Sequence, residues 1–265
     1  MRLCLDPKDL NKAIKRNQWY NRTIDDVLPE LANSKYFSLL DAKSGYWHVP
    51  LYKESRLLTT FNTPWGKYMW LRLPFELTVA GDVFQERLDR VLKSVPSTTG
   101  IADDVLCYGN AEIPHDAAVI TLLETARANN LTFNAEKFVF KSQDCPFFGG
   151  SLTPHGYKID PQKIQAITEM KAPLKPSRSS KLSWFLVNYL NRFSPKLADL
   201  KDPLRALCKK GVVFAWEISQ QEAFGAIKKE ITRATVLAYV EKSKTSVIQS
   251  DASEKGLGTV SKSSA

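Results

Sequence analysis

The stretches YFSLLD, residues 36–41, and GIADDVLCYG, residues 100–109, hold the pattern that decides the fold. The first is an apolar run that ends at Asp41, which predicts a buried strand with an acid at its exit. The second predicts a tight hairpin with Asp103 and Asp104 at its tip. Neighbouring carboxylates repel each other and resist burial, but a divalent cation removes that cost, and hard oxygen ligands favour Mg²⁺. The three aspartates are a candidate metal site; the alternative is a polar hairpin turn, in which Asp is common.

The segments around these two stretches alternate between helix and strand patterns. Thr23 and Asp26 have the spacing of a capping box at a helix start. Apolar residues at helical spacing predict helices over residues 80–95, 115–129 and 163–170. The remaining predicted elements are a short helix or turn at 9–16 and strands at 2–6, 57–61, 67–73, 147–153, 236–239 and 247–249. This order predicts an α+β fold.

Composition and charge exclude several classes of protein. The 265 residues are 43% hydrophobic and 25% charged, as in ordinary globular proteins. No apolar run approaches the roughly 20 residues that span a bilayer, and no apolar segment of a secretory signal is visible. The four cysteines lie far apart, so neither a disulfide framework nor a zinc knuckle is expected. Residues 161–212 carry eleven Lys and Arg against three acids; this suits a nucleic-acid backbone or, alternatively, a solvated basic face.

Ordered motifs run through the whole chain. They are RLCLDPKDLNKAIKR, KYFSLLDAKSGYWHVPL, LLTTFNTPWGKYMWLRLPF, VFQERLD, IADD, HD, ANNLTFNAEKF, FFGGSLTPHGYKIDPQKIQAI and VNYLNRFSPKLADLKDPLRALCKK. In this order they resemble the reverse transcriptases of gypsy-like long-terminal-repeat retrotransposons. The resemblance implies a right-hand polymerase, with an antiparallel palm sheet plus helices, a helical thumb and the start of a ribonuclease H-like α/β domain. The implied domains are partial fingers and palm at 1–160, a basic thumb-like segment at 161–212, and a connection with a truncated ribonuclease H-like domain at 213–265.

The same resemblance assigns the catalytic and metal-binding role to three carboxylates. Asp41 is the first catalytic acid, and Asp103 and Asp104 are the hairpin pair; all three bind Mg²⁺, with Mn²⁺ as the alternative. Gln85 matches a glutamine of the family's helix that follows the LPF motif, here residues 80–95, and is expected to be structural. Asp251 matches the first ribonuclease H carboxylate.

Other residues are assigned to the nucleotide and the primer by resemblance. Arg2 contacts the triphosphate, or is a surface arginine. Tyr46 is the steric gate against a ribose 2′-hydroxyl, although such an aromatic also suits core packing. Phe75 packs against the nucleotide sugar and the templating base. Lys137 lies near the nucleotide as a proton donor to pyrophosphate, or is a helix-end cation. Phe148 and Gly149 resemble the primer grip.

Some positions depart from the family pattern. Glu76 replaces a glycine in LPF-G beside the nucleotide; a charge about 4 Å from a phosphate costs on the order of 4 kcal/mol at an effective dielectric near 20. Ala80 and Gly81 replace Ser-Pro, which removes a cap and a rigid first position. KLSWFLVNYL, residues 181–190, is two residues shorter than the family helix, a shift of about 200°. The chain starts inside the fingers and stops just after Asp251, so no hydrolysis of a hybrid is expected.

The sequence therefore predicts an RNA-directed DNA polymerase that transfers a nucleotide from a dNTP to a primer 3′-hydroxyl by two-metal chemistry. The expected partners are dNTPs and an RNA or DNA template with its primer; no membrane partner is expected. The predicted location is intracellular and cytoplasmic, with particles or the nucleus as alternatives, and the protein is not expected to be secreted. The alternative function is a catalytically dead retrotransposon remnant that retains only nucleic-acid binding.

Overall fold

The computed structural model describes residues 4–172, 193–194, 197, 200, 202–207, 215–233, 236–239, 246–253 and 256–263. The chain divides into two compact units, residues 1–148 together with 240–265, and residues 149–239. Each unit is treated separately below.

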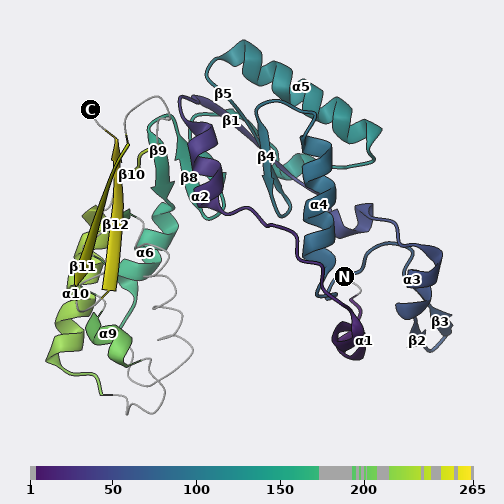
Figure 1. Cartoon of the computed structure of the whole chain (residues 1–265), viewed down its shortest axis with the longest axis horizontal. Coiled ribbons are helices and arrows are strands. Elements are labelled where there is room, and N and C mark those ends of the chain that lie inside the picture. The colour runs from purple at the N-terminus through teal and green to yellow at the C-terminus, as the bar shows by residue number, and fades with distance from the viewer. Residues whose placement is uncertain are drawn as a thin grey trace. The chain divides into compact units, whose positions relative to one another are not determined.

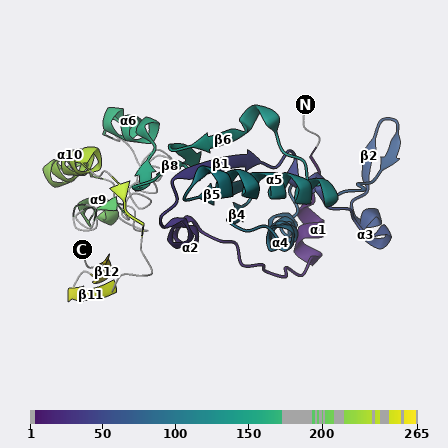
Figure 2. The same cartoon turned by 90° about the horizontal axis from the view of Figure 1, so that it is seen from above.

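The centre of the first unit is a four-stranded antiparallel sheet in the order β4-β5-β1-β6. Figure 1 labels β4, β5 and β1 of this sheet, and Figure 2 labels all four strands. Its strands are β1 (Tyr36–Asp41), β4 (Thr98–Ile101), β5 (Asp104–Gly109) and β6 (Val139–Ser142). Two helices pack on it, α4 (Ala80–Leu92) and α5 (Glu112–Ala128). Because β1 and β5 are the two inner strands, any side chain at their ends has a position fixed from both sides.

Side-chain alternation along the strands explains the core of this unit. Leu40 on β1 and Val105 on β5 are register partners, and both face the helices. Phe84 of α4 and Leu122 of α5 pack into the same cluster, so the two helices cover one face of the sheet (Figure 2). Each fully buried side chain of this size contributes about 1.5–3 kcal/mol to folding. The core therefore holds the ends of β1 and β5 rigidly.

Shorter elements surround this sheet. They are α1 (Lys8–Ala13), α2 (Ile24–Val27), η1 (Leu28–Leu31), η2 (Gly45–His48), α3 (Lys53–Leu58), β2 (Phe61–Thr63), β3 (Gly66–Tyr68), η3 (Ala135–Lys137) and β7 (Cys145–Phe147). The predicted capping box is confirmed, since the Thr23 backbone N–H donates to Asp26 Oδ2 over 2.7 Å. A separate hairpin is formed by β11 (Ser246–Ser253) and β12 (Gly256–Ser263), paired from Ser246↔Ser263 to Ser253↔Gly256.

The second unit combines three antiparallel strands with helices. The strands β8 (Gly150–Thr153), β9 (Gly156–Ile159) and β10 (Val236–Leu237) pair in the order β10-β9-β8. The helices with described bounds are α6 (Pro161–Glu169), α9 (Asp202–Ala206) and α10 (Ile218–Arg233). Ile159, Ile167 and Ile227 meet in its core, together with Leu197 and Ile231.

The predicted α+β class is confirmed, but four local predictions were wrong. Residues 57–61 are not a strand, because α3 runs through Leu58 and β2 begins only at Phe61. The strand at 67–73 ends at Tyr68. A turn with positive φ at Phe148 and Gly149 divides the strand predicted at 147–153. Residues 4–6 are not a strand. No helix in the described part of the chain is long and apolar enough to cross a membrane.

Candidate active site

Two of the predicted carboxylates are brought together by strand register. Asp41, the last residue of β1, is the direct partner of Asp104, the first residue of β5. The Ala42 N–H donates to the Asp103 carbonyl oxygen over 2.7 Å, so the pairing continues into the turn that carries Asp103. Residues directly opposite in an antiparallel pair have Cβ atoms about 4.5–5.5 Å apart. The backbone thus gathers carboxylates that are far apart in sequence.

The hairpin turn between β4 and β5 is held from α4. Ala102 has a φ of 52°, and its N–H donates to Gln85 Oε1 over 2.9 Å. Gln85 Nε2 donates to the Gly100 carbonyl oxygen over 3.2 Å. Gln85 is buried, and its amide spans both sides of the turn. The expectation that Gln85 is structural agrees with these contacts, because the amide fixes the turn on which Asp103 sits.

Burial and the neighbouring carboxylates shift the pKa of Asp104. Burial raises the pKa of Asp104, and the nearby charges of Asp41 and Asp103 raise it further, whereas Lys137 lowers it. Lys137 Nζ lies 2.8 Å from Asp41 Oδ2. Its hydrogen bond to Asp41 raises the pKa of the Lys137 ammonium. Excess negative charge at the end of β1 and β5 therefore attracts a cation, and in this conformation that cation is the Lys137 ammonium.

The donor set suits a hard divalent cation, and the Lys137 ammonium now occupies one side of it. Carboxylate oxygens are the preferred ligands of Mg²⁺, which commonly takes one or two of them together with substrate phosphates. Within the described ranges, no three His, Cys, Asp or Glu side chains already form a metal-holding group. Asp41 would have to exchange Lys137 for a metal ion. The residues fit Mg²⁺ in their chemistry, and substrate phosphates would complete the ligand set.

An aromatic wall stands beside the carboxylates. Tyr46, on η2, lies with its ring centroid 5.1 Å from Phe75 and 5.7 Å from Phe84. Burial raises the pKa of Tyr46, and the charge of Asp103 adds to this. A Cβ built on Gly45 would lie 2.6 Å from Phe84 Cζ and 2.7 Å from Asp103 Oδ1. Tyr46 and Phe75, the two aromatic residues predicted to form the nucleotide pocket, therefore meet. The missing side chain of Gly45 leaves room for Phe84 and for the Asp103 carboxylate.

The turn after Phe75 is held by a side chain and has a strained backbone, unlike the carboxylate end, which strand pairing holds. Glu76 has a φ of 72°, which is in the left-handed region that disfavours a side chain. Asn11 clamps the turn: its Nδ2 donates to the Glu76 carbonyl oxygen over 2.9 Å, and its Oδ1 accepts from the Thr78 N–H over 3.0 Å. The departure at Glu76 is therefore a backbone problem as well as a charge.

The start of α4 lacks a side-chain cap, as its sequence predicts. Val79 occupies the cap position and makes no capping hydrogen bond. Asp82 in the first turn is buried instead against Arg16, with Arg16 Nε 2.6 Å from Asp82 Oδ2. Asn21 Nδ2 also donates to Asp82, over 3.1 Å. The buried carboxylate near the helix N-terminus takes over part of the stabilising role of a cap.

Of the other predicted residues, some lie outside the described residues and the rest lie on other segments of the chain. Arg2 lies outside the described residues, as does the shortened segment 181–190. Phe148 and Gly149 form the turn between β7 and β8, with φ values of 46° and 82°. Asp251 lies on β11 opposite Gly258. The structure thus brings together Asp41, Asp103, Asp104, Tyr46, Phe75 and Lys137.

Sequence reasoning missed two residues of the site. Gly45 and Asn11 both act through contacts with distant segments, which no local pattern reveals. The only local signal was the glycine directly before Tyr46.

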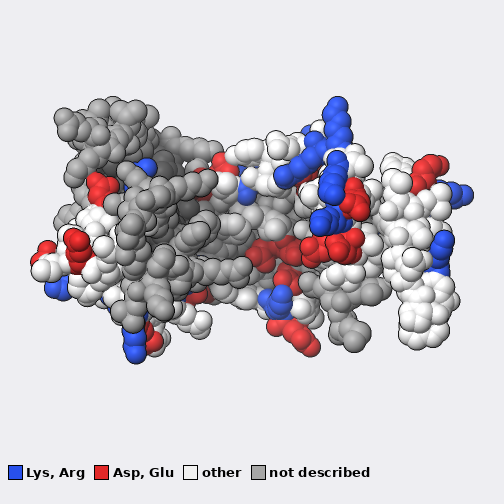
Figure 3. All heavy atoms as spheres, turned by 90° about the horizontal axis from the view of Figure 1, so that it is seen from below, with Lys and Arg blue, Asp and Glu red and all other residues white. Residues whose placement is uncertain are grey.

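On the face in Figure 3, acidic side chains gather beside a group of Lys and Arg side chains. The described surface on this side is therefore mixed in charge and does not form a uniform basic field.

Family comparison decides the identity of this fold. The family described as "Reverse transcriptase (RNA-dependent DNA polymerase)" matches residues 1–173. The chain belongs to the reverse transcriptase family. Residues 216–263 match an "RNase H-like domain found in reverse transcriptase". The predicted membership is confirmed.

Known relatives are retrotransposon polyproteins. The retrovirus-related Pol polyprotein from transposon 412 of Drosophila melanogaster is 31% identical over 261 residues, which cover 98% of this chain and 21% of the polyprotein. The transposon Tf2-7 polyprotein of Schizosaccharomyces pombe is 29% identical over 264 residues, which cover 98% of this chain and 20% of the polyprotein. This reverse transcriptase chain spans about a fifth of the length of these relatives.

Solved structures confirm the polymerase fold. A foamy viral protease-reverse transcriptase in complex with double-stranded DNA matches with a TM-score of 0.87 at 21% identity, over 95% of this chain and 45% of that one. A foamy viral protease-reverse transcriptase in complex with an RNA/DNA hybrid matches with a TM-score of 0.84 at 19% identity, over 98% of this chain and 37% of that one. At this identity the likeness shows the fold of the reverse transcriptase chain.

Proposed function

We propose that this chain is the core of a retrotransposon RNA-directed DNA polymerase, which transfers a nucleotide from a dNTP to a primer 3′-hydroxyl. The supporting observation is the register pair of Asp41 and Asp104 with Asp103 in the adjoining turn. A carboxylate whose pKa is raised by burial and by like charges is typical of functional sites. A purely structural turn would have no need to place Asp41 opposite this pair.

The chain's own residues supply orientation, proton placement and shape. The two ions, Mg²⁺ or alternatively Mn²⁺, supply activation of the attacking hydroxyl and stabilisation of the leaving pyrophosphate when bound. Asp41 and Asp104 are aimed by the strand ladder, so their backbone keeps its place when Asp41 exchanges its Lys137 contact for a metal ion. The Lys137 ammonium holds a proton 2.8 Å from Asp41, where it can be donated to the departing pyrophosphate. Tyr46 against Phe75 forms a wall that excludes a ribose 2′-hydroxyl.

The partners follow from this chemistry. The substrates in this proposal are dNTPs and an RNA or DNA template with its primer; the foamy viral relatives were solved with double-stranded DNA and with an RNA/DNA hybrid. Arg2 would bind the triphosphate, and Phe148 and Gly149 would contact the primer.

The division into residues 1–160, 161–212 and 213–265 remains our proposal for the functional domains. Asp251 remains our proposal for the vestigial ribonuclease H position. We place the activity inside the cell, in the cytoplasm.

Primer extension tests the proposal directly. The protein is incubated with an RNA template, a DNA primer, dNTPs and Mg²⁺ or Mn²⁺, and incorporation is compared with that of the double variant Asp103→Asn/Asp104→Asn. Asp9→Asn is the matched control, since Asp9 is exposed and pairs only with Lys12. We expect extension by the wild type and by Asp9→Asn, and background incorporation by the double variant. If the wild type incorporates no more than the double variant, catalysis by this chain is rejected.

A second function, nucleic-acid binding without catalysis, is favoured by the turn at Glu76. A side chain at a φ of 72° strains the position that the family pattern gives to glycine. This alternative predicts salt-sensitive binding to primer–template, read by fluorescence anisotropy, without extension. Restoring Glu76→Gly together with Gly81→Pro should then raise incorporation. No gain in the double variant would show that these two departures are not the cause.

A further inference from the structure

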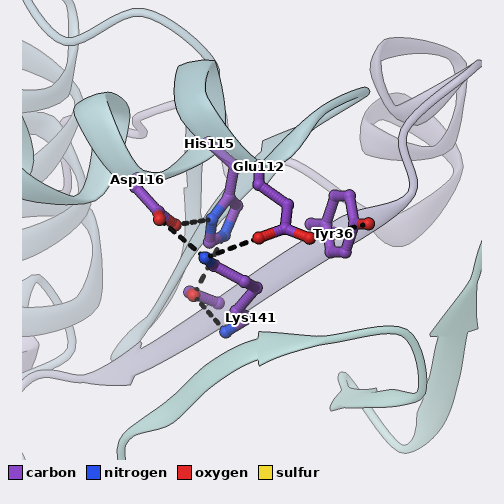
Figure 4. Close-up of polar contacts among 6 residues, drawn as sticks. Tyr36, Glu112, His115, Asp116 and Lys141 are labelled. Atoms are coloured by element: carbon purple, nitrogen blue, oxygen red, sulfur yellow. Dashed lines mark hydrogen bonds and ion pairs between the residues drawn. The ribbon is translucent and has the colours of Figure 1, made fainter.

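A polar cluster lies where α5 meets β1 and β6 (Figure 4). Ser38 Oγ lies 3.0 Å from His115 Nε2, and His115 Nδ1 lies 3.0 Å from Asp116 Oδ1. Lys141 Nζ contacts Asp116 Oδ2 at 2.6 Å and Glu112 Oε2 at 3.2 Å. These residues come from three elements, with Ser38 on β1, Lys141 on β6 and the remaining three on α5. The cluster therefore ties the helix to two neighbouring strands.

The order serine, histidine, aspartate resembles that of a hydrolase, but the burial is wrong for hydrolysis. Ser38 and His115 are both 0% exposed, so no substrate can reach the hydroxyl. Ser38 Oγ is also engaged as an acceptor, because the Lys141 backbone N–H donates to it over 2.9 Å. The cluster is consequently an internal support.

The reason that Lys141 reaches Ser38 is an irregularity in the ladder between β1 and β6. Phe37 pairs with Ser142 and Leu39 pairs with Val139. Between these pairs β1 has one residue, Ser38, whereas β6 has two, Phe140 and Lys141, which is the pattern of a β-bulge. Lys141 has a φ of 47°, in the left-handed region. The N–H of half-buried Lys141 is taken out of the ladder by the bulge, and the Ser38 hydroxyl is its acceptor.

His115 completes the hydrogen bonding of the hydroxyl. Since Ser38 Oγ accepts from Lys141, its own hydrogen can be donated to His115 Nε2, and the Nδ1 proton of a neutral His115 can be donated to Asp116. A Cβ built on Gly109 of β5 would lie 2.8 Å from His115 Cβ, so this strand also closes on the histidine. The hydroxyl is fixed from two directions and cannot turn away from the bulge.

The bulge sets where the residues before it fall. Lys137 precedes Val139 by two residues, and Lys137 Nζ reaches Asp41 Oδ2 over 2.8 Å. If the bulge opened, β6 could slip along β1 by one position, about 3.3 Å, while Asn134, whose N–H donates to the Asp41 carbonyl oxygen over 2.8 Å, would stay anchored, so the short link that carries Lys137 would be displaced. That displacement exceeds the tolerance of a hydrogen bond. We propose that Ser38, held by His115, locks the β6 bulge and thereby delivers Lys137 to Asp41. Ser38 and His115 are positioning residues.

The importance of Ser38 for nucleotide transfer rests on the proposed polymerase function. The placement of Lys137 at Asp41 can, however, be measured without any activity. A carbodiimide joins an ammonium to a carboxylate only when the two are in contact, so the Lys137–Asp41 cross-link, quantified by mass spectrometry, reports the register. The Lys12–Asp9 pair, also at 2.8 Å, is the internal reference. Ser38→Ala should lower the Lys137–Asp41 yield about fivefold or more relative to the reference, as expected for one lost buried hydrogen bond.

Lys141→Gly is the matched control. It removes the ammonium from the cluster but keeps the backbone N–H, and glycine accepts a φ of 47°. The cross-link should persist in this variant. Loss of the cross-link in Lys141→Gly as large as in Ser38→Ala would overturn the proposal, because the ion pairs would then set the register. If Ser38→Ala does not melt cooperatively, Ser38→Cys, a weaker acceptor, should give an intermediate yield.

An unchanged cross-link yield in a folded Ser38 variant overturns the proposal. Primer extension and primer–template binding are measured on the same samples. Where the wild type extends primers, Ser38→Ala should slow extension with unchanged primer–template affinity, and equal slowing of extension by Lys141→Gly would count against the register role. Where the wild type does not extend, the proposed function fails, and the cross-link alone still decides the role of Ser38.

Discussion

The carboxylate end of β1 and β5 and the turn at Glu76 belong to one candidate site but are held in different ways. Asp41 and Asp104 are positioned by the ladder of two inner strands and by the core beneath them. The turn is positioned by Asn11 and contains a side chain at positive φ. Asp41 and Asp104 would be presented by the same backbone whatever their side chains. The turn geometry, by contrast, depends on which residue occupies position 76.

This difference teaches where sequence change is tolerated. A new side chain near the ladder must fit among packed neighbours. In the turn, the side chain of Glu76 is accommodated by a strained backbone, which the hydrogen bonds of Asn11 hold in place. Four changes differ in size and in sign. Those at Gly45, which packs against Asp103, and at buried Asp82 should weaken the protein, whereas those at Glu76 and Gly81 should strengthen it.

The largest effect is expected at Gly45. In Gly45→Ala the new Cβ would lie 2.6 Å from Phe84 Cζ and 2.7 Å from Asp103 Oδ1, so the ring and the carboxylate must both move. We expect a loss of about 1–3 kcal/mol in the free energy of unfolding and, where the chain is active, at least about a tenfold loss of extension. Urea denaturation and primer extension measure these. Gly225→Ala is the control, since its Cβ would meet nothing within 4 Å; equal behaviour of the two variants would refute close packing at Gly45.

The next effect is expected at Asp82, whose side chain is 2% exposed while that of Arg16 is 50% exposed. Asp82→Asn should lower the free energy of unfolding by about 1–2 kcal/mol at neutral pH, less than the roughly 3–5 kcal/mol for breaking a fully buried pair, because Arg16 is half exposed. The Arg16 hydrogen bond lowers the pKa of Asp82 below its ordinary value of 3.8. The stabilisation is therefore present above that pH and is lost as the pH falls through the lowered folded-state pKa.

Urea denaturation at a series of pH values checks this sign. The difference between wild type and Asp82→Asn should be full near pH 7 and should shrink as the solution is acidified below 3.8. Asp9→Asn, which removes an exposed pair with Lys12, should cost no more than about 0.5 kcal/mol. A difference that grows on acidification would contradict the ion pair as its cause.

The third change, Glu76→Gly, should stabilise. Relief of a left-handed residue is worth about 1–3 kcal/mol, and glycine loses about 0.5–1 kcal/mol through backbone entropy, so we expect a net gain of about 1 kcal/mol. Thermal unfolding measures it. Glu76→Gln keeps the side chain at a φ of 72° and removes only the charge. A lower KM for dNTP in both variants would show that the charge of Glu76 weakens nucleotide binding. A gain in thermal stability in Glu76→Gly alone would show that the strained backbone is the cause of the lost stability.

The sequence predicted the elements whose signals are local. The run ending at Asp41 and the hairpin at Asp103 formed as predicted because apolar residues and turn residues stand next to each other in the chain. The helix α3 was missed because its Leu57 and Leu58 are exposed, which leaves no buried stripe to recognise.

The parts that could not be predicted depend on distant segments. The pairing of Asp41 with Asp104 joins positions 63 residues apart. The residue pattern made them a candidate metal site with a polar turn as the alternative, and the family resemblance favoured the metal site. The bulge at Lys141 depends on Ser38, 103 residues away. The clamp of Asn11 on the Glu76 turn spans 65 residues. Periodicity carries no information about such contacts, whose cost or benefit appears only after the sheet is assembled.

The smallest effect is expected at Gly81, in the first turn of α4. A Cβ there would meet only Tyr46 Oη, at 3.8 Å, which is ordinary van der Waals contact. Gly81→Ala should therefore stabilise by about 0.5–1 kcal/mol, since alanine restricts the unfolded chain and favours the helix. Thermal unfolding measures the gain, and KM for dNTP should not change. A loss of stability, or a raised KM, would show that Tyr46 needs the space over Gly81. The turn before α4 would then be as tightly constrained as the ladder, and the difference between the two regions would disappear.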